Sequence, residues 1–193
     1  MRAFVIAMNN EADCVRPFLK ADDRLYVSGV GKVNAAAAAQ KAICEGANEI
    51  LNAGVVGGLE PSMSVGDTYE VSQAVEYDFD LMALNGTARG THNERTTPYF
   101  DCVTSGMRAA KILATGDRFT DDPLDATCAL ELGAGLRDME GAAIAHVCET
   151  NGIPCRMLKC VSDVHGKGSM TGQYKDNLGK ALACLKDALI SWM

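Results

Sequence analysis

Several acidic residues in this chain each stand directly after a segment predicted to form a β-strand. They are Glu11, Asp117, Glu140 and Asp163. Carboxyl groups in different environments can divide the roles of general acid and general base between them. Each acid taken alone has an ordinary alternative, because Asp and Glu also cap helices and favour helix N-termini. Their joint occurrence favours a catalytic interpretation.

Two glycine-containing segments also have a chemical interpretation. Residues 29–34 (GVGKVN) resemble a dinucleotide-binding turn, but Asn34 replaces the third glycine. As a P-loop the segment lacks the first glycine and the Ser or Thr that would meet magnesium, so no magnesium-nucleotide site is expected. Residues 54–58 (GVVGG) follow a buried strand, and their glycines predict that a planar ligand can lie against the backbone. A plain tight turn is the alternative.

No metal and no cofactor is expected. His92, His146 and His165 lack the spacing of a metal site. We expect His146 to be structural, whereas His165, two residues after Asp163, is a candidate to line the site. The eight cysteines include no C-x-x-C pair and lie mostly in apolar stretches, so we expect reduced core residues.

The hydrophobic pattern predicts the elements that must position these residues. Strands are expected over residues 3–8, 25–27, 49–53, 68–75, 111–115, 136–139 and 155–161, and helices over 32–45, 123–132, 140–149 and 174–192. The alternation predicts the α/β class, as a three-layer α/β/α sandwich with a central mixed, mostly parallel sheet. Ligands bind at the carboxyl ends of strands in such sheets, so the acids are expected to converge. The polar residues 84–97 are expected to form a mobile loop.

Composition narrows the class of protein. The 193 residues are 48% hydrophobic and 22% charged, which suits a single domain over 1–193. The net charge of −7 disfavours nucleic acid as a partner. The sequence has no apolar run near the roughly 20 residues of a membrane helix and no signal-peptide pattern. We therefore expect a cytoplasmic protein that does not bind membranes.

Beyond these patterns, the chain resembles the nucleoside phosphorylase and nucleosidase superfamily, and in particular the 5′-methylthioadenosine/S-adenosylhomocysteine nucleosidases. The resemblance runs nearly end to end. It is carried by residues 7–11 (AMNNE), 28–34 (SGVGKVN), 52–58 (NAGVVGG), 66–67 (GD), 78–80 (DFD), 115–119 (TGDRF), 138–148 (DMEGAAIAHVC) and 161–163 (VSD).

The resemblance implies a role for each of three acids. Asp163 would protonate the purine nitrogen N7, Glu140 would hold the ribose hydroxyls, and Glu11 would position and deprotonate the attacking water. Further residues would bind the substrate, a purine nucleoside. Met139 would pack against the sugar, and the backbone of Thr120 would read the edge of the base.

Aromatic and small residues complete the expected substrate site. Phe119 would stack on the base, with a core position as the alternative. Tyr174 is a candidate lid over the 5′ group, with an ordinary surface tyrosine as the alternative. The remaining residues expected at the substrate are Val30, Val55, Val56, Gly57 and Ser162.

Hydrolysis rather than phosphorolysis is favoured. Phosphorolytic relatives carry an Arg in the strand before the glycine segment and a Ser after its first glycine, where this chain has Leu51-Asn52-Ala53 and Val55. The resemblance implies release of adenine from methylthioadenosine, S-adenosylhomocysteine or a similar nucleoside, as in methionine salvage. The alternatives are a purine nucleoside phosphorylase, a futalosine-type hydrolase and, from another class, a non-catalytic nucleoside-binding protein.

The resemblance also implies a homodimer in which the segment after Asp78-Phe79-Asp80 crosses to the partner. Leu81, Met82 and Leu84 would then lie in the interface. Members of the family carry aromatic residues for the 5′ pocket in this segment, where the chain has residues 84–86 (LNG). The identity of the 5′ substituent is therefore left open.

Overall fold

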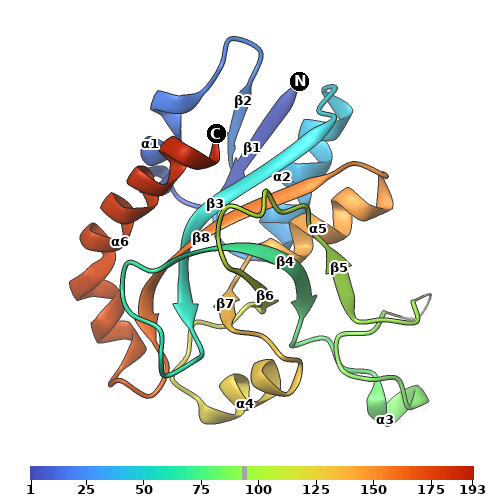
Figure 1. Ribbon diagram of the computed structural model, residues 1–193. Helices are drawn as coiled ribbons and strands as arrows, with labels where there is room; N and C mark the ends of the chain where they lie inside the picture. Colours follow the sequence, from blue (N-terminus) through green and yellow to red (C-terminus); the bar gives the residue numbers. More distant parts are fainter. Residues whose placement is uncertain (93–94) are drawn as a thin grey trace.

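The computed structural model describes residues 1–92 and 95–193. Its strands are β1 (Arg2–Ile6), β2 (Arg24–Val27), β3 (Glu49–Gly58), β4 (Thr68–Glu76), β5 (Tyr99–Asp101), β6 (Ala110–Thr115), β7 (Leu136–Asp138) and β8 (Cys155–Val164). Its helices are α1 (Asn9–Val15), the 3₁₀ turn η1 (Arg16–Phe18), α2 (Lys32–Cys44), α3 (Met82–Asn85), α4 (Pro123–Glu131), α5 (Gly141–Thr150) and α6 (Met170–Trp192). Figure 1 shows the strands in the middle of the molecule with helices around them.

The strands form one mixed sheet. Its order is β2-β1-β3-β7-β6-β4-β5, and β8 pairs with both β3 and β4. Strands β1, β3 and β8 run parallel, so their carboxyl ends meet on the same side, and β7 pairs with the last residues of β3. Because β4, β6 and β7 are paired in turn, the centre of the sheet closes into a ring of strands. The expected mixed, mostly parallel sheet is confirmed.

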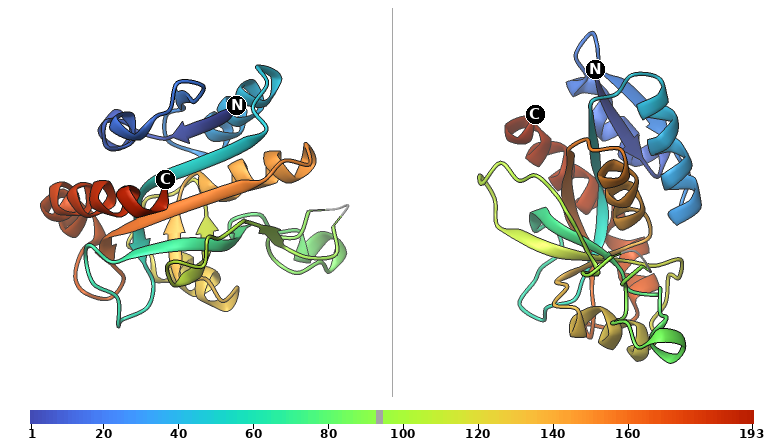
Figure 2. Two further views of the ribbon diagram at one scale, coloured as in Figure 1. Left: turned by 45° about the horizontal axis from the view of Figure 1, so that its top comes forward. Right: turned by 90° about the vertical axis from the view of Figure 1, so that its right-hand side faces the viewer.

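Helices cover both faces of the sheet, as expected for three layers. Ile50 and Leu51, which are neighbours in β3, lie in different hydrophobic clusters, because successive strand residues point to opposite faces. The cluster around Ile50 includes alanines of α2 and residues of α5, whereas the cluster around Leu51 includes residues of α1 and α6. Figure 1 shows α6 on the left of the strands and α5 on the right, and Figure 2 shows the same arrangement from two further sides.

Strands β3 and β8 extend beyond the predicted ends. Residues 54–58 belong to β3, so neither a loop nor a tight turn is present there. Strand β8 likewise continues through Ser162 and Asp163 to Val164. The two strands pair in parallel along nearly their whole length, with Gly54 opposite Lys159 and Gly57 opposite Asp163. These ladder hydrogen bonds outweigh the low strand propensity of glycine.

Several helix predictions need correction. Residues 9–15 form α1, which the short polar sequence did not reveal. The last helix begins at Met170 rather than Tyr174, because the Ser169 side chain caps it by accepting from the Gly172 N–H. Glu140 precedes α5 as its N-cap residue. The expected mobile loop over residues 84–97 includes the end of α3, and residues 93–94 lie outside the described residues.

Helices long and apolar enough to cross a membrane are absent from the described chain.

Candidate active site

A cavity of about 380 Å³ lies at the carboxyl ends of β1, β3 and β8. The structure brings most of the predicted site residues together around it: Glu11, Val30, Val55, Val56, Gly57, Phe119, Met139, Glu140, Ser162, Asp163 and Tyr174. Residues of the lining that the sequence reasoning did not single out are Ala7, Met8, Arg118, Arg137, Asp138, Met170 and Thr171. The three acids assigned roles from the family resemblance therefore share one cavity.

Glu11 lies in the first turn of α1 and is held by backbone N–H groups. The N–H of Val55 donates to Oε1 at 2.8 Å, and the N–H of Met8 donates to Oε2 at 3.1 Å. Burial raises the pKa of this carboxyl, and the two hydrogen bonds oppose that rise. Glu11 therefore has a fixed orientation at the cavity wall.

Gly54 makes room for Glu11 rather than for a ligand. A Cβ at Gly54 would lie 2.5 Å from Oε1 of Glu11, far inside van der Waals contact. Gly57 does line the cavity, and a Cβ there would lie 3.0 Å from Oδ2 of Asp163. The glycines were predicted to make room for a ligand. The structure shows that Gly54 and Gly57 also make room for the carboxylates of Glu11 and Asp163.

Asp163 lies in β8 and is almost fully buried. The Ser162 hydroxyl donates to Oδ1 at 2.7 Å, whereas Oδ2 has no hydrogen-bond partner among the described residues. Burial raises the pKa of Asp163, although the Ser162 hydrogen bond and the charge of Arg137 oppose the rise. A carboxyl group with a raised pKa and one uncommitted oxygen is suited to donating a proton.

Glu140 lies at the start of α5 and contacts the turn before α2. Its Oε1 accepts from the N–H of Gly31 at 2.9 Å, and Gly31 has the positive φ of 103° that glycine tolerates. Burial, reinforced by the negative charge of Asp138, raises the pKa of Glu140 to about 7. Glu140 is therefore poised to change its protonation state near neutral pH.

A buried ion pair between Lys159 and Asp138, which the sequence analysis did not predict, lies next to the cavity. The Nζ of Lys159 is 2.8 Å from Oδ2 of Asp138, and both side chains are 3% exposed. Asp138 also accepts from the hydroxyl of Thr115 at 2.6 Å and from the N–H of Gly141 at 3.0 Å. Asp138 raises the pKa of Lys159, although burial opposes this. A lysine inside the apolar run of residues 155–161 was the available sequence signal.

Two aromatic residues form the mouth of the cavity. Phe119 is 47% exposed, so the alternative that it belongs to the core is wrong. Its ring meets the ring of Tyr174 edge to face, with centroids 5.5 Å apart. Tyr174 lines the cavity and is only partly exposed, and its hydroxyl lies 3.6 Å from Sδ of Met8. Both rings line the cavity.

Arg137 is the least expected residue of the lining. It is 6% exposed, and its Nη2 donates to the carbonyl of Thr120 at 2.7 Å. Nη2 also lies 3.1 Å from Sδ of Met170, while Nη1 has no partner among the described residues. Thr120 itself is outside the cavity lining, and the Arg137 bond already engages its carbonyl oxygen.

The remaining candidates lie elsewhere. His165 is outside the cavity lining, and Asp117 accepts from the backbone N–H of Lys32 at 2.8 Å. His146, expected to be structural, hydrogen bonds to Glu76. The eight cysteines all lie within the described residues and are free, and most are buried.

Comparisons with known proteins identify the family of this chain. The chain matches the family model described as the phosphorylase superfamily over residues 24–190. The 5′-methylthioadenosine/S-adenosylhomocysteine nucleosidase of Treponema pallidum is 32% identical in an alignment of 190 positions that covers 79% of this chain and 71% of that protein. The aminodeoxyfutalosine nucleosidase of Campylobacter jejuni is 31% identical over 74% of this chain and 68% of its own length.

The fold is shared with solved structures as well. The futalosine hydrolase of Helicobacter pylori superimposes with a TM-score of 0.87 at 20% identity, over 99% of this chain and 96% of that chain. The family match spans most of the chain, and relatives above 30% identity are covered over more than two thirds of their length. The chain therefore belongs to the phosphorylase superfamily.

Proposed function

We propose that this protein is a nucleosidase that hydrolyses the N-glycosidic bond of a purine nucleoside, with methylthioadenosine and S-adenosylhomocysteine as its candidate substrates. One observation carries the proposal. Asp163 presents a buried carboxyl with an uncommitted oxygen in the same cavity as Glu11 and Glu140. Relatives above 30% identity that are named as nucleosidases support it.

The purine leaves more easily when its ring is protonated. In the proposed mechanism Asp163 gives a proton to N7 of the base as the bond between N9 and C1′ breaks, so the base departs neutral. The raised pKa of Asp163 favours the protonated carboxyl that this step needs. The Ser162 hydrogen bond on Oδ1 leaves Oδ2 as the donor oxygen.

Water supplies the new bond at C1′. Glu11 accepts a proton from the attacking water, and the resulting hydroxyl remains on the sugar. Glu140 holds the ribose hydroxyls, and negative charge beside the sugar stabilises the positive charge that develops on it. The sugar and base would pack against Met139, Val30, Val55 and Val56. The rings of Phe119 and Tyr174 would then cover the bound substrate.

The environment of Glu11 favours water over phosphate as the nucleophile. Its carboxylate engages the N–H of Val55, which would otherwise be available to an anion. A carboxylate at that point also repels phosphate. The neighbouring Asn52 amide donates to the carbonyl of Val5 instead of facing the cavity.

A product assay tests the proposal. Methylthioadenosine, S-adenosylhomocysteine, adenosine and inosine would each be incubated with the protein, with and without phosphate, and the base and sugar identified by chromatography. We expect free base and free sugar without phosphate. Strict dependence on phosphate, or no base release from any of the four, would contradict it.

Arg137 favours a second candidate function, hydrolysis of 6-oxopurine nucleosides such as inosine. The guanidinium donates hydrogen bonds and accepts none. It lines the same cavity as Asp163, the proposed partner of N7, and its charge opposes the rise in the pKa of that carboxyl. Next to N7 a 6-oxopurine carries an acceptor, O6, whereas adenine carries an amino donor. The unpartnered Nη1 of Arg137 is therefore matched to O6.

The two candidate functions differ in the purine base that the wild-type enzyme prefers and in whether Arg137→Met removes that preference. If Arg137 reads O6, the wild-type kcat/KM for inosine exceeds that for adenosine, and the substitution lowers this ratio by about tenfold or more, since a hydrogen bond from a charged group contributes roughly 1.5–3 kcal/mol. A wild-type preference for adenosine that Arg137→Met leaves unchanged would eliminate the second candidate and retain the first.

We further infer that the protein acts as a homodimer through the segment that contains α3. Met82 and Leu84 are 56% and 78% exposed, which supports an apolar contact there. Light scattering after gel filtration would measure the mass of the wild type and of a Leu84→Glu variant. We also propose that the protein acts in the cytoplasm, and activity on methylthioadenosine would support a role in methionine salvage.

A further inference from the structure

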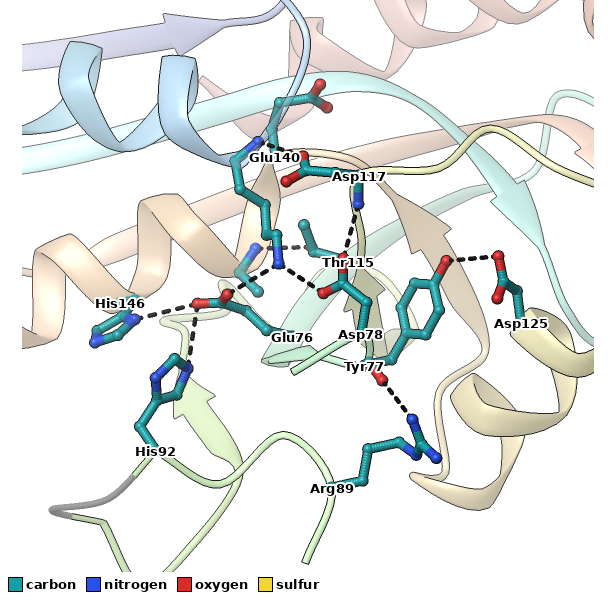
Figure 3. A network of polar contacts seen from close by, with 12 residues as sticks. Glu76, Tyr77, Asp78, Arg89, His92, Thr115, Asp117, Asp125, Glu140 and His146 are labelled. Carbon is teal, nitrogen blue, oxygen red and sulfur yellow. Dashed lines mark hydrogen bonds and ion pairs between the residues drawn. The ribbon is translucent and has the colours of Figure 1, made fainter. Parts of the chain in front are cut away.

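Two histidines and a glutamate meet outside the purine cavity. Glu76 ends β4, His92 follows α3 in the chain, and His146 lies in α5 (Figure 3). The three side chains line a second cavity of about 530 Å³. Their positions in the sequence gave no metal-ligand spacing, and the fold alone brings them together.

The separations of the three ligand atoms suit a single small cation. One oxygen of Glu76, Oε1, lies 3.1 Å from Nδ1 of His146 and 3.5 Å from Nε2 of His92. All three ligand atoms lie within 4.8 Å of one another. Tetrahedral bonds of ~2.0–2.1 Å to Zn²⁺ place neighbouring ligand atoms about 3.3 Å apart. Little movement would therefore be needed to surround an ion.

Neighbouring aromatic rings hold both imidazoles in place. The His92 ring stacks on Phe79 with centroids 4.0 Å apart, and the His146 ring stacks on Phe100 at 4.4 Å. Ligands whose orientation is already fixed lose little conformational entropy when they bind a metal. The cluster is thus a preformed set of ligands rather than a chance meeting of mobile side chains.

One of these ligand atoms lacks a partner. Nε2 of His92 is buried and makes no hydrogen bond within the described residues, because its approach to Glu76 does not have hydrogen-bond geometry. A buried polar atom without a partner costs free energy. A cation at the cluster would satisfy Nε2 and would replace the proton now shared between His146 and Glu76.

The local charge also favours a divalent cation. Lys32 lies 3.3 Å from Glu76, but on the other carboxylate oxygen, Oε2, and it pairs at 2.6 Å with Asp78. Asp117 faces the same cavity. Three carboxylates, those of Glu76, Asp78 and Asp117, therefore lie around this cluster (Figure 3). Two cations oppose them: Lys32, and Arg95, whose guanidinium lies 4.2 Å from the centre of the Phe100 ring and acts on His92.

We propose that Glu76, His92 and His146 form a Zn²⁺ site that is separate from the nucleoside cavity, with the remaining coordination position open to the second cavity. Two imidazoles and one carboxylate are ligands that Zn²⁺ accepts, and three protein ligands leave room for water. Mg²⁺ and Ca²⁺ prefer oxygen ligands and are not expected to bind.

Zn²⁺ binding to the chelator-treated protein tests the proposal. Calorimetry with ZnCl₂ should show one saturable equivalent, and ZnCl₂ should raise the melting temperature whereas MgCl₂ should not. Glu76→Gln and His146→Gln each remove one ligand with little change in size. Both should weaken binding by more than the roughly 10- to 100-fold that loss of an outer-shell partner costs.

A matched control is His165→Gln, which removes a histidine outside the cluster and should bind Zn²⁺ as the wild type does. Each variant is compared with itself with and without metal, so a change in intrinsic stability does not obscure the result. No saturable Zn²⁺ binding by the wild type, or equal binding by His146→Gln and His165→Gln, would overturn the proposal. Both outcomes are independent of nucleosidase activity.

Discussion

Replacing Gly54 by alanine would test whether the shape of β3 positions the proposed general base. The new methyl group would lie 2.5 Å from Oε1 of Glu11, where ordinary contact begins at 3.4 Å. The carboxylate would have to retreat by roughly 0.9 Å, because the Gly54 backbone that carries the new methyl group is held by its pairing with β8. Such a shift is enough to break its 2.8 Å hydrogen bond from Val55.

The expected loss of activity follows from this displacement. A misplacement of about 1 Å can cost about 100-fold, and complete loss of a positioned base about 10²- to 10⁴-fold. We therefore expect Gly54→Ala to lower kcat/KM by about 10²-fold or more in a base-release assay. Its circular dichroism spectrum and cooperative unfolding should remain.

Two further variants make the result specific to Glu11. Gly179→Ala adds the same methyl group in the exposed part of α6, where nothing lies within 4 Å. It should retain full activity and gain up to about 1 kcal/mol of stability. If Gly54→Ala acts through Glu11, then adding it to Glu11→Ala should cost nothing further. A folded Gly54→Ala enzyme within about threefold of wild-type activity would refute the reasoning.

Three other predictions concern the buried acids. Asp163→Asn should lower kcat by about 10²-fold or more while the fold is retained, as measured by turnover and circular dichroism; wild-type turnover would remove Asp163 from the mechanism. The pKa of Glu140 rises from 4.5 to about 7 in the fold, so the stability from its protonated form is present below pH 4.5 and lost as pH rises through about 7. Urea unfolding of Glu140→Gln between pH 4.5 and 8 should lack this component, and a pH profile identical to wild type would contradict it. Lys159→Met leaves Asp138 buried without its cation and should cost about 3–5 kcal/mol in urea unfolding, whereas the double variant with Asp138→Asn should recover part of that loss.

The order of elements was predictable because it depends on local patterns. Apolar runs at the spacing of buried strands, separated by helical stretches, predicted the sheet and its carboxyl-end site. The predicted end of β3 and the predicted start of α6 differ from those in the structure. Residues Gly54 to Gly58 were predicted to follow the strand, as a ligand-binding segment or a tight turn, because glycine has low strand propensity, and pairing with β8 makes them part of β3.

The sequence by itself determined which acids stand at strand ends, and its motifs carried the resemblance to the family. Tertiary structure alone decided how those acids behave. Burial raises the pKa values of Glu11, Glu140 and Asp163, and burial depends on the whole assembled core.

Contacts between distant residues were also beyond the sequence pattern. Three of these contacts join residues of separate elements. They are the close approach of Glu11 to Gly54, the ion pair of Lys159 with Asp138 and the hydrogen bond of His146 with Glu76. Residue spacing along the chain encodes neighbours within one helix or strand. The meeting of side chains from different elements depends on sheet order and packing, which only the folded chain specifies.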